Sequence, residues 1–444
     1  AANVREGVEV MDPGLITAIV LAALFVLFLS GMPVFGALAM ASVTGILLLQ
    51  GLDGLGAIPG VIYDRMSGFT LVAVPLFILM GEIIFVSGLG ADIYTATSRW
   101  LSGLRGSLGI ASVAACAIFG ALCGVSVAGA ATIGKFAIPE MLKRGYDRRL
   151  ATGCVAAAGG LALLIPPSVG LILYGLVANQ SVGLLFIAGI VPGVILALMM
   201  MAWIFLVGYL RPSAVGVDDR TVPWAQRWDS RWRIWPVIGL IAAVLGTIYT
   251  GVATPTEAAA IGSLGAFLVA LLRGKLDLAT TGRILRETMV NTGMILAILA
   301  SALVFGYLLT RLRVPQDLVM LVTESGLSET VVLIGIFALL ILMGMFMDVV
   351  SVILIATPIL LPSIEAMGYD PLWFGIVMAI ACEMAVITPP VGLNLFVIKG
   401  ISPHPVSLGD VTRGAAPFVL VLMLGLALFV AFPQLVLWLP FQTL

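Results

Sequence analysis

Two proline pairs interrupt long apolar stretches of the sequence, within residues 164–168 (LIPPS) and 387–391 (ITPPV). A proline pair removes two amide donors and cannot continue an α-helix. Inside a membrane the freed carbonyl oxygens need partners, so such a break is tolerated where it lines a cavity or binds something. Carbonyl oxygens suit Na⁺, and the N-terminus of the next half-helix suits a carboxylate. The pairs predict cation and carboxylate binding; the alternative is two proline kinks that relieve packing strain.

Five polar residues in or beside apolar segments are further candidates. Asp348 interrupts one apolar block, and buried acids in membranes are usually functional. It would attract a cation, carry a proton or bind a substrate, unless it only caps the next half-helix or lies at a water-filled mouth. Ser126 and Thr388 either ligate a cation or satisfy the backbone of their own helices. Glu82 and Glu383 either bridge scaffold and moving parts or carry protons.

The composition places these residues in a membrane. Of the 444 residues, 61% are hydrophobic and only 10% are charged, and the mean hydropathy is +1.18. A soluble domain with this ratio could not cover its surface with polar groups. Several apolar stretches reach the roughly 20 residues that cross a bilayer core. The chain is therefore predicted to be an all-α, polytopic integral membrane protein.

Composition also excludes several functional classes. The net charge of −1 leaves no basic surface, so no nucleic-acid partner is expected. One histidine, His404, cannot form a histidine metal cluster, and its loop position does not suit a Ser-His-Asp triad. The cysteines lie in apolar stretches and are interpreted as small buried residues. These are Cys116, Cys123, Cys154 and Cys382.

Hydropathy predicts ten membrane spans and two interrupted apolar blocks. The spans are expected at about residues 14–30, 32–50, 70–88, 149–179, 183–209, 234–250, 257–273, 288–309, 371–400 and 415–440. The blocks lie at about 107–140 and 331–363, and each has small or polar residues midway. Each block is either two short spans or one hairpin that enters and leaves by the same side.

The two halves of the chain repeat each other at an offset of 223 residues. The tripeptides at 102–104 and 145–147 recur at 325–327 and 368–370, and the first proline pair falls on the second. Five predicted spans precede residue 234 and five follow it. An odd number of spans in each copy inverts the second copy in the membrane. The sequence therefore predicts an inverted structural repeat.

Loop charges orient this topology. If both blocks are re-entrant hairpins, 17 Lys and Arg residues fall on one side and four on the other, with Lys135 inside a hairpin. The side rich in basic residues is expected to be cytoplasmic. Both termini then face outward, and the hairpins enter from opposite sides. A single crossing by each block would largely abolish the bias, whereas two full crossings would leave it unchanged.

These expectations divide the chain into four segments. They are a tail at 1–12, a first repeat at 13–210 with its broken helix at about 149–179, a connector at 211–233, and a second repeat at 234–444 with its broken helix at about 371–400. The connector alternates Trp and Arg residues, which is typical of an amphipathic segment at a membrane surface. We expect it on the cytoplasmic side, in contact with the lipid bilayer.

Five strings resemble the large membrane subunit of tripartite ATP-independent periplasmic (TRAP) transporters, the DctM type. They are residues 74–81 (VPLFILMG), 145–147 (GYD), 164–168 (LIPPS), 253–258 (ATPTEA) and 387–394 (ITPPVGLN). The strings span nearly the whole chain in the order that the family has. Together they are highly specific, although each alone is modest.

The resemblance implies Na⁺-coupled uptake of an organic acid, such as a C4-dicarboxylate or sialic acid, across the bacterial inner membrane. An elevator-type movement would carry the hairpins and broken helices past a scaffold formed mainly by 14–50 and 234–273. Two partners are implied: a periplasmic substrate-binding protein (P type) and a small four-helix membrane subunit (Q type). No cofactor is expected besides Na⁺ as coupling ion, and both termini would be periplasmic.

The resemblance also implies site residues. One sodium site would use Gly120, Cys123, Ala162, Ile165 and Pro167, and the other Gly344, Ala385, Thr388 and Val391, mostly through carbonyls. Substrate contacts are expected from Asp348, Ser126, Ser168 and Asn394. The first hairpin departs from the Ser-rich tip of many relatives, with Gly120 where serine is common and Ala162 in place of a frequent glycine. Backbone ligation is compatible with these changes.

Three other functions stay open on the sequence. A stand-alone Na⁺/dicarboxylate symporter would work without a binding protein. A passive channel would conduct without a Na⁺ gradient and without saturation. An intramembrane enzyme, for example a protease using Asp348 with Glu383, has no paired-aspartate or Ser-His arrangement to support it.

Overall fold

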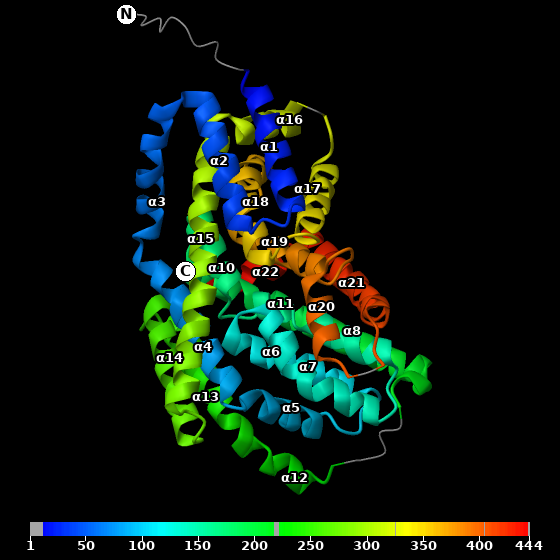
Figure 1. The fold of residues 1–444 in the computed structure, drawn as a ribbon. Helices are drawn as coiled ribbons and strands as arrows, with labels where there is room; N and C mark the ends of the chain where they lie inside the picture. The colour runs from blue at the N-terminus through cyan, green and yellow to red at the C-terminus, as the bar shows by residue number, and fades with distance from the viewer. Residues whose placement is uncertain (1–11, 217–221, 325, 404, 443–444) are drawn as a thin grey trace, which may run out of the picture.

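The computed structural model describes residues 12–216, 222–324, 326–403 and 405–442 (Figure 1). Throughout these ranges the regular structure is helical, with α-helices, short 3-10 helices and no named β-strand. The predicted all-α fold is confirmed. His404 and almost all of the predicted tail at 1–12 lie outside the described residues.

The helices follow one another in two halves joined by the connector. The first half has α1 (Pro13–Leu29), α2 (Val34–Gln50), η1 (Leu52–Ala57), α3 (Ile58–Met66), η2 (Phe69–Val72), α4 (Ala73–Val86), α5 (Leu89–Trp100), α6 (Ser107–Cys123), α7 (Ser126–Lys143), α8 (Arg148–Ala158), α9 (Leu161–Leu164), α10 (Val169–Ala178) and α11 (Val182–Leu210). The connector contains η3 (Pro212–Ala214) and α12 (Trp224–Asp229). The second half has α13 (Arg231–Tyr249), α14 (Pro255–Leu272), α15 (Leu278–Arg311), α16 (Val314–Glu324), α17 (Glu329–Gly344), α18 (Val349–Ala366), α19 (Pro371–Val386), α20 (Leu393–Ile401), α21 (Leu408–Ala431) and α22 (Gln434–Gln442).

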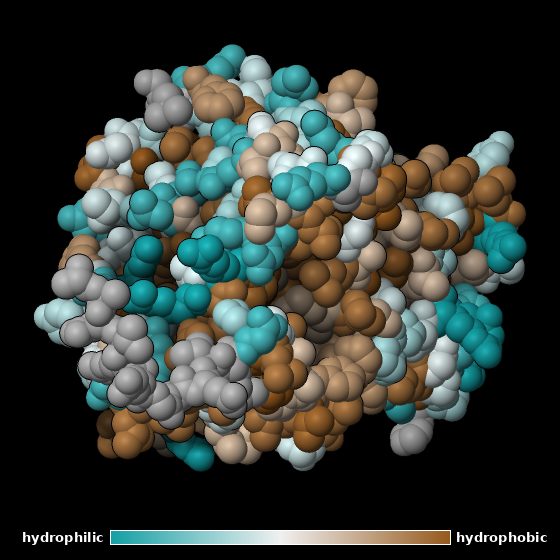
Figure 2. Space-filling view, turned by 90° about the horizontal axis from the view of Figure 1, so that it is seen from above, coloured by the Kyte–Doolittle hydropathy of each residue, from teal (hydrophilic) through white to brown (hydrophobic). Residues whose placement is uncertain are grey.

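Many of these helices are suited to a membrane. Among the described residues, seven are long and apolar enough to cross one, and the bent pair formed by α8–α9 and α10 would be an eighth span. The shorter apolar helices α1, α2 and α19 occupy three further positions where spans were predicted. Hydrophobic side chains also remain exposed over much of the surface (Figure 2), as expected where lipid is the solvent. The chain is a multi-pass membrane protein.

Short polar side chains begin several helices. Asp147 and Asp370 occupy the same position of the predicted repeat and accept hydrogen bonds from backbone N–H groups in the first turns of α8 and α19. Ser168 and Asp348 do the same for α10 and α18. Such caps satisfy amide donors that a helix cannot pair internally. Side-chain caps therefore mark the helix starts at the first proline break and at the second turn, whereas α7 and α20 start without one.

Each interrupted apolar block folds into two helices joined by a short turn. The first consists of α6 and α7, and the second of α17 and α18; the two helices of each pair pack against each other. Helices α7 and α18 both contain 18 residues, and their first residues, Ser126 and Val349, lie 223 positions apart. The inversion of the two copies relative to a membrane stays a prediction.

The chain is not helical across either proline pair. Helix α9 ends at Leu164 and α10 begins at Val169, and the helices on either side of this break differ in direction by 43°. Helix α19 ends at Val386, and α20 begins at Leu393. The first break is mostly buried, whereas much of the second is exposed at the protein surface. The two proline pairs thus have different surroundings in this structure.

The structure differs from the predicted spans in three places. The span expected at 415–440 is divided, because Phe432 adopts a non-helical conformation (φ −130°, ψ 73°) before Pro433, as residues preceding proline tend to do. Helix α15 begins at Leu278, ten residues earlier than the expected 288. Helices α5 and α16 were not predicted, because each carries too many polar residues to score as a span.

Helices α8 and α21 make one of the closest contacts between the two halves. A Cβ atom added at Gly153 on α8 would collide with the carbonyl group of Gly414 on α21, and one added at Gly414 would collide with the carbonyl oxygen of Arg149. Small residues allow helix backbones to approach this closely in membranes. This contact fixes the broken helix of the first half against the second half.

We expect Gly153→Ala to destabilise the protein, because its methyl group has no space between the two backbones. Overpacking of this kind costs about 1–3 kcal/mol. Gly246→Ala is the matched control, since Gly246 is also helical and a Cβ there would have no neighbour within 4 Å. Thermal unfolding of the detergent-purified variants measures the difference. Equal melting temperatures for the two variants would contradict the close contact.

Candidate transport site

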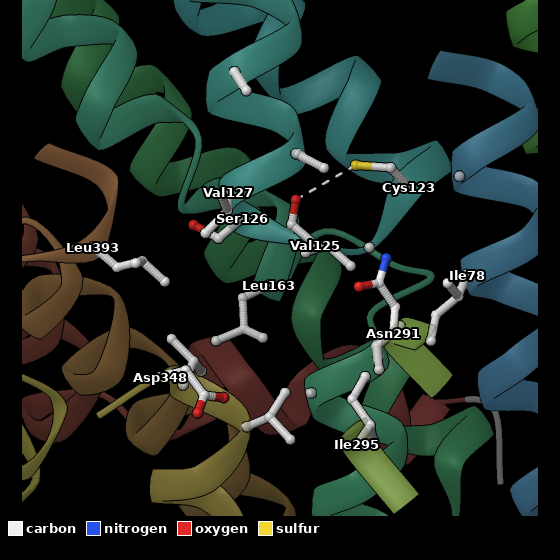
Figure 3. A pocket seen from close by; sticks show the side chains of 18 of the residues that line it. Ile78, Cys123, Val125, Ser126, Val127, Leu163, Asn291, Ile295, Asp348 and Leu393 are labelled. Atoms are coloured by element: carbon white, nitrogen blue, oxygen red, sulfur yellow. Dashed lines mark hydrogen bonds between the residues drawn. The ribbon is translucent and has the colours of Figure 1, made fainter. Parts of the chain in front are cut away.

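A cavity of about 460 Å³ lies where the turns of both helix pairs meet the two breaks (Figure 3). The first residues of four helices line it, namely Ser126 of α7, Val169 of α10, Val349 of α18 and Leu393 of α20. A helix N-terminus has unpaired amide donors and carries roughly +0.5 elementary charge. Four positive helix ends therefore surround one space.

Three carboxylates line the same cavity: Glu82, Asp348 and Glu383. Among the described residues that line it there is no Lys, Arg or His. The four N-termini supply roughly +2 elementary charges. The C-termini of α6 and α19, at Cys123 and Val386, supply roughly −1, and the acids add three negative charges when all are ionised. A bound anion is attracted by the helix ends but repelled by the acids. It therefore needs cations to accompany it.

Asp348 both lines the cavity and starts a helix. Its carboxylate accepts a hydrogen bond from the backbone N–H of Ser351 at 3.1 Å, and another from the Ser351 hydroxyl. The capping role considered from the sequence is thus present. In Figure 3 the same side chain lies beside the cavity, opposite the turn that contains Ser126. One residue can therefore hold the start of α18 and place negative charge at the site.

Ser126, Glu383 and Asn394 form a buried polar cluster at the cavity wall. The Ser126 hydroxyl donates to Glu383 Oε2 at 3.1 Å, and Asn394 Nδ2 donates to Ser126 Oγ at 3.0 Å. The cluster joins the turn of the first half to α19 and α20 of the second half. The sequence analysis named Glu383 as a proton carrier or as a bridge between scaffold and moving parts, but not among the sodium or substrate ligands.

Glu82 forms a second polar contact at the cavity. Asn291 of α15 donates from Nδ2 to Glu82 Oε1 at 3.2 Å, and both residues line the cavity. Figure 3 shows Asn291 across the cavity from Asp348. Asn291 was not among the residues expected at the site. Its amide side chain among the apolar residues of a predicted span could have indicated it. The contact links α4 to α15.

The expected substrate residues occupy two different environments. Asp348, Ser126 and Asn394 line the cavity. Ser168 does not, because it is completely buried at the start of α10, where its hydroxyl accepts a hydrogen bond from the N–H of Leu171 at 3.3 Å. It lies directly behind Gly124, since a Cβ added at Gly124 would be 3.3 Å from the Ser168 Cα.

The residues expected for the first sodium site lie on two segments in direct contact. A Cβ added at Gly120 would lie 2.7 Å from the Ala162 Cα, so α6 touches the backbone of α9. Gly124 has a left-handed conformation (φ 61°), and a Cβ there would lie 2.6 Å from the carbonyl oxygen of Pro167. Only glycine fits both the conformation and the contact. The first turn therefore rests directly on the first break.

Cys123 and Ile165 lie at the edges of this contact. The Cys123 thiol lines the cavity and donates to the carbonyl oxygen of Val125 at 3.5 Å (dashed in Figure 3). Ile165 is half-buried and packs towards Gly193 of α11, where an added Cβ would lie 2.6 Å from an Ile165 side-chain carbon. Oxygen ligands in this region would therefore have to come from the backbone.

The second expected sodium site is only partly assembled. Gly344 touches α19, because a Cβ added there would lie 2.6 Å from the Ala385 Cβ. The Thr388 hydroxyl donates to the carbonyl oxygen of Met384 at 2.6 Å, so it satisfies its own helix while its oxygen can still accept. Val391 is 40% exposed at the surface of the chain. The second turn and break thus offer a more open site than the first.

Comparison with known proteins defines the class first. The fold is similar to that of the Alcanivorax borkumensis YdaH transporter, with a TM-score of 0.64 over 96% of this chain and 99% of that chain, at 14% sequence identity. The described helices therefore adopt a fold found in membrane transporters.

The sequence then identifies the family. The family model described as tripartite ATP-independent periplasmic transporter, DctM component, matches residues 21–435. The chain belongs to this family, as the five strings predicted. The C4-dicarboxylate TRAP transporter large permease protein DctM of Pseudomonas aeruginosa is 35% identical over 397 residues, which cover 89% of this chain and 91% of that protein. The ectoine TRAP transporter large permease protein TeaC of Halomonas elongata is 33% identical over 428 residues, with 95% and 98% covered.

Substitutions of Asp348 separate its two roles. Asp348→Ala removes the cap of α18 and should lower stability by about 1 kcal/mol, whereas Asp348→Asn should keep it, because asparagine caps helices equally well. Transport should fall in both variants if the charge acts at the cavity. Thermal unfolding and uptake are measured for each variant. Asp370→Asn is the control, because it alters a helix cap that does not line the cavity. Normal uptake by Asp348→Asn would show that the charge of Asp348 is not needed for transport.

Proposed function

We propose that the chain is the permease of a Na⁺-coupled symporter that carries an organic acid across the bacterial inner membrane. The observation that carries this proposal is the convergence of four helix N-termini on one cavity with three acidic side chains. Helix N-termini favour a carboxylate, while the acids oppose it unless cations bind too. Coupling to Na⁺ supplies both the charge and the driving force.

The two sodium sites are proposed at the contacts between turns and breaks. Gly120 against Ala162, and Gly344 against Ala385, bring backbone of each turn close to backbone of each broken helix. Carbonyl oxygens of unwound helices coordinate Na⁺ in secondary transporters. A Na⁺ ion at each contact would hold a turn to its break. The substrate space would then lie between two sites that each carry a positive charge.

The substrate class and the partners rest on the family. Two relatives are named for the transport of C4-dicarboxylate and of ectoine, and both are large permeases of TRAP transporters. Because the family is described as tripartite, we propose a periplasmic binding protein that delivers the substrate and a small four-helix membrane subunit beside the permease.

An elevator movement is proposed for the helices that surround the cavity. The turns and broken helices contact one another across the halves, with α7 against α20 and α10 against α18. A separate set of contacts joins α1 with α2, α2 with α15 and α4 with α14. The first set would move as one body along the second. Such a movement would expose the cavity to either side in turn.

Reconstitution tests the proposal. The permease, with its small subunit and binding protein, is placed in proteoliposomes, and uptake of candidate acids is measured with and without an inward Na⁺ gradient. Saturable uptake is expected only when both the gradient and the binding protein are present. Uptake without the binding protein would exclude the tripartite mechanism and favour a stand-alone symporter. Unsaturable conductance without a gradient would indicate a channel.

Thr388→Val tests the second sodium site. The substitution removes the hydroxyl oxygen, and we expect the Na⁺ concentration for half-maximal uptake to rise about tenfold, as for other losses near a metal. Thr357→Val is the matched control, because its hydroxyl donates to the carbonyl oxygen four residues earlier at the same 2.6 Å but Thr357 is outside the expected second sodium site. If the Na⁺ dependence of uptake is unchanged in Thr388→Val, the Thr388 hydroxyl is not a sodium ligand.

A further inference from the structure

Glu383 is a buried carboxylate with one oxygen unused. The residue is 2% exposed, and its Oε2 accepts a hydrogen bond from Ser126, whereas Oε1 has no hydrogen-bond partner. A Cβ added at Gly160 would collide with this carboxylate, so it lies directly against the backbone near α9. An ionised carboxylate in a low-dielectric interior is costly unless it is paired. None of the described residues that line its cavity is basic.

Asn394 has a second unused oxygen beside it. The residue is completely buried, and its Nδ2 donates to Ser126 Oγ at 3.0 Å and to the carbonyl oxygen of Ala156 at 3.2 Å. Both amide hydrogens are therefore used, which fixes the orientation of the side chain, because a flipped amide would place two oxygens together. Asn394 Oδ1 is left without a hydrogen-bond partner.

One hydroxyl connects these two side chains. The Ser126 hydroxyl donates a hydrogen bond to Glu383 and accepts one from Asn394. The carboxylate and the amide therefore both contact one oxygen atom at the start of α7. All three residues line the cavity. The cluster therefore holds two buried oxygen acceptors without donors, one of them on a carboxylate, on two residues that share the Ser126 hydroxyl. Buried acceptors without donors require an explanation.

Three species can be compared at this position. A proton on Glu383 would remove the charge and let the carboxyl group donate to the Asn394 oxygen, and this state would not depend on Na⁺. A water molecule would donate to both oxygens but leave the charge. A metal cation satisfies both oxygens and neutralises the carboxylate. A single carboxylate matches one positive charge, and no group of three or more His, Cys, Asp and Glu side chains that could hold a metal exists among the described residues, so the chemistry fits a monovalent cation better than a divalent one.

We propose that Glu383, Asn394 and Ser126 form a third cation site, for Na⁺ or a cation of similar chemistry. The site differs from the two proposed sodium sites because its ligands are side chains and it joins the two halves of the chain directly. Ser126 comes from the first half, and Glu383 and Asn394 come from the second. A cation here removes one of the three negative charges at the cavity before an anion enters. Only this last role rests on the proposed function.

The test measures sodium binding to the full chain purified in detergent. Radioactive sodium bound per protein and the melting temperature are followed against NaCl, with choline chloride keeping the ionic strength constant. Glu383→Gln preserves the shape and an acceptor for Ser126, and it should lose one bound Na⁺ per protein. If Na⁺ still raises the melting temperature of Glu383→Gln through this site, the Na⁺ concentration required should be at least about tenfold higher than for the unsubstituted protein. Ser126→Ala removes one proposed ligand, a hydroxyl that caps no helix, and should raise the Na⁺ concentration required, which keeps the test informative if Glu383→Gln does not fold.

Glu82→Gln is the charge-matched control, because it removes an equal charge from the same cavity at a carboxylate that is bonded to Asn291. It should keep the full number of bound Na⁺ ions. Unchanged sodium binding in Glu383→Gln, with Ser126→Ala also unchanged, would overturn the site and indicate water or a proton there. Equal losses of bound Na⁺ in Glu82→Gln and Glu383→Gln would also overturn the site. General attraction between Na⁺ and the acidic cavity would then explain the binding. If sodium binding behaves as expected but no uptake occurs in proteoliposomes, the proposed function fails and the site stands.

Discussion

Inside a membrane, a helix that ends at mid-depth cannot leave its backbone groups to water, and the protein has to satisfy them itself. Much of this structure follows from that constraint. The two turns and the two proline breaks create eight helix ends, and the terminal residues of six of them line one cavity. Gly124, pressed against the carbonyl of Pro167, shows how closely a turn must approach a break to do so. The ends that remain open become the binding surface.

Charge balance explains why this surface holds acids at all. Positive helix ends alone would bind an anion permanently, because nothing would weaken the attraction on release. Glu82, Asp348 and Glu383 offset that attraction, so that the cavity favours an anion only together with cations. In the proposed symporter, the same charge balance would make substrate binding depend on an ion gradient.

The two halves are alike in sequence pattern but not in surroundings. The first turn is closed against a mostly buried break, whereas Thr388 and Val391 of the second break are partly or clearly exposed. In the proposed elevator movement, this asymmetry would let the accessible unit change as the moving helices shift. Both units carry a proline pair and an aspartate cap at the equivalent starts of α8 and α19, so these shared features do not account for the asymmetry.

The sequence by itself determined the helical membrane fold, the places where helices break and the family. Hydrophobic stretches and proline pairs act locally, so their effects can be read along the chain. It also singled out Asp348, Ser126 and Asn394, because polar residues are rare in such segments. Only the tertiary structure brought Glu383 to Ser126 across 257 positions, kept Ser168 away from the cavity and paired Asn291 with Glu82. These contacts depend on how the two halves pack, and no local pattern records that packing.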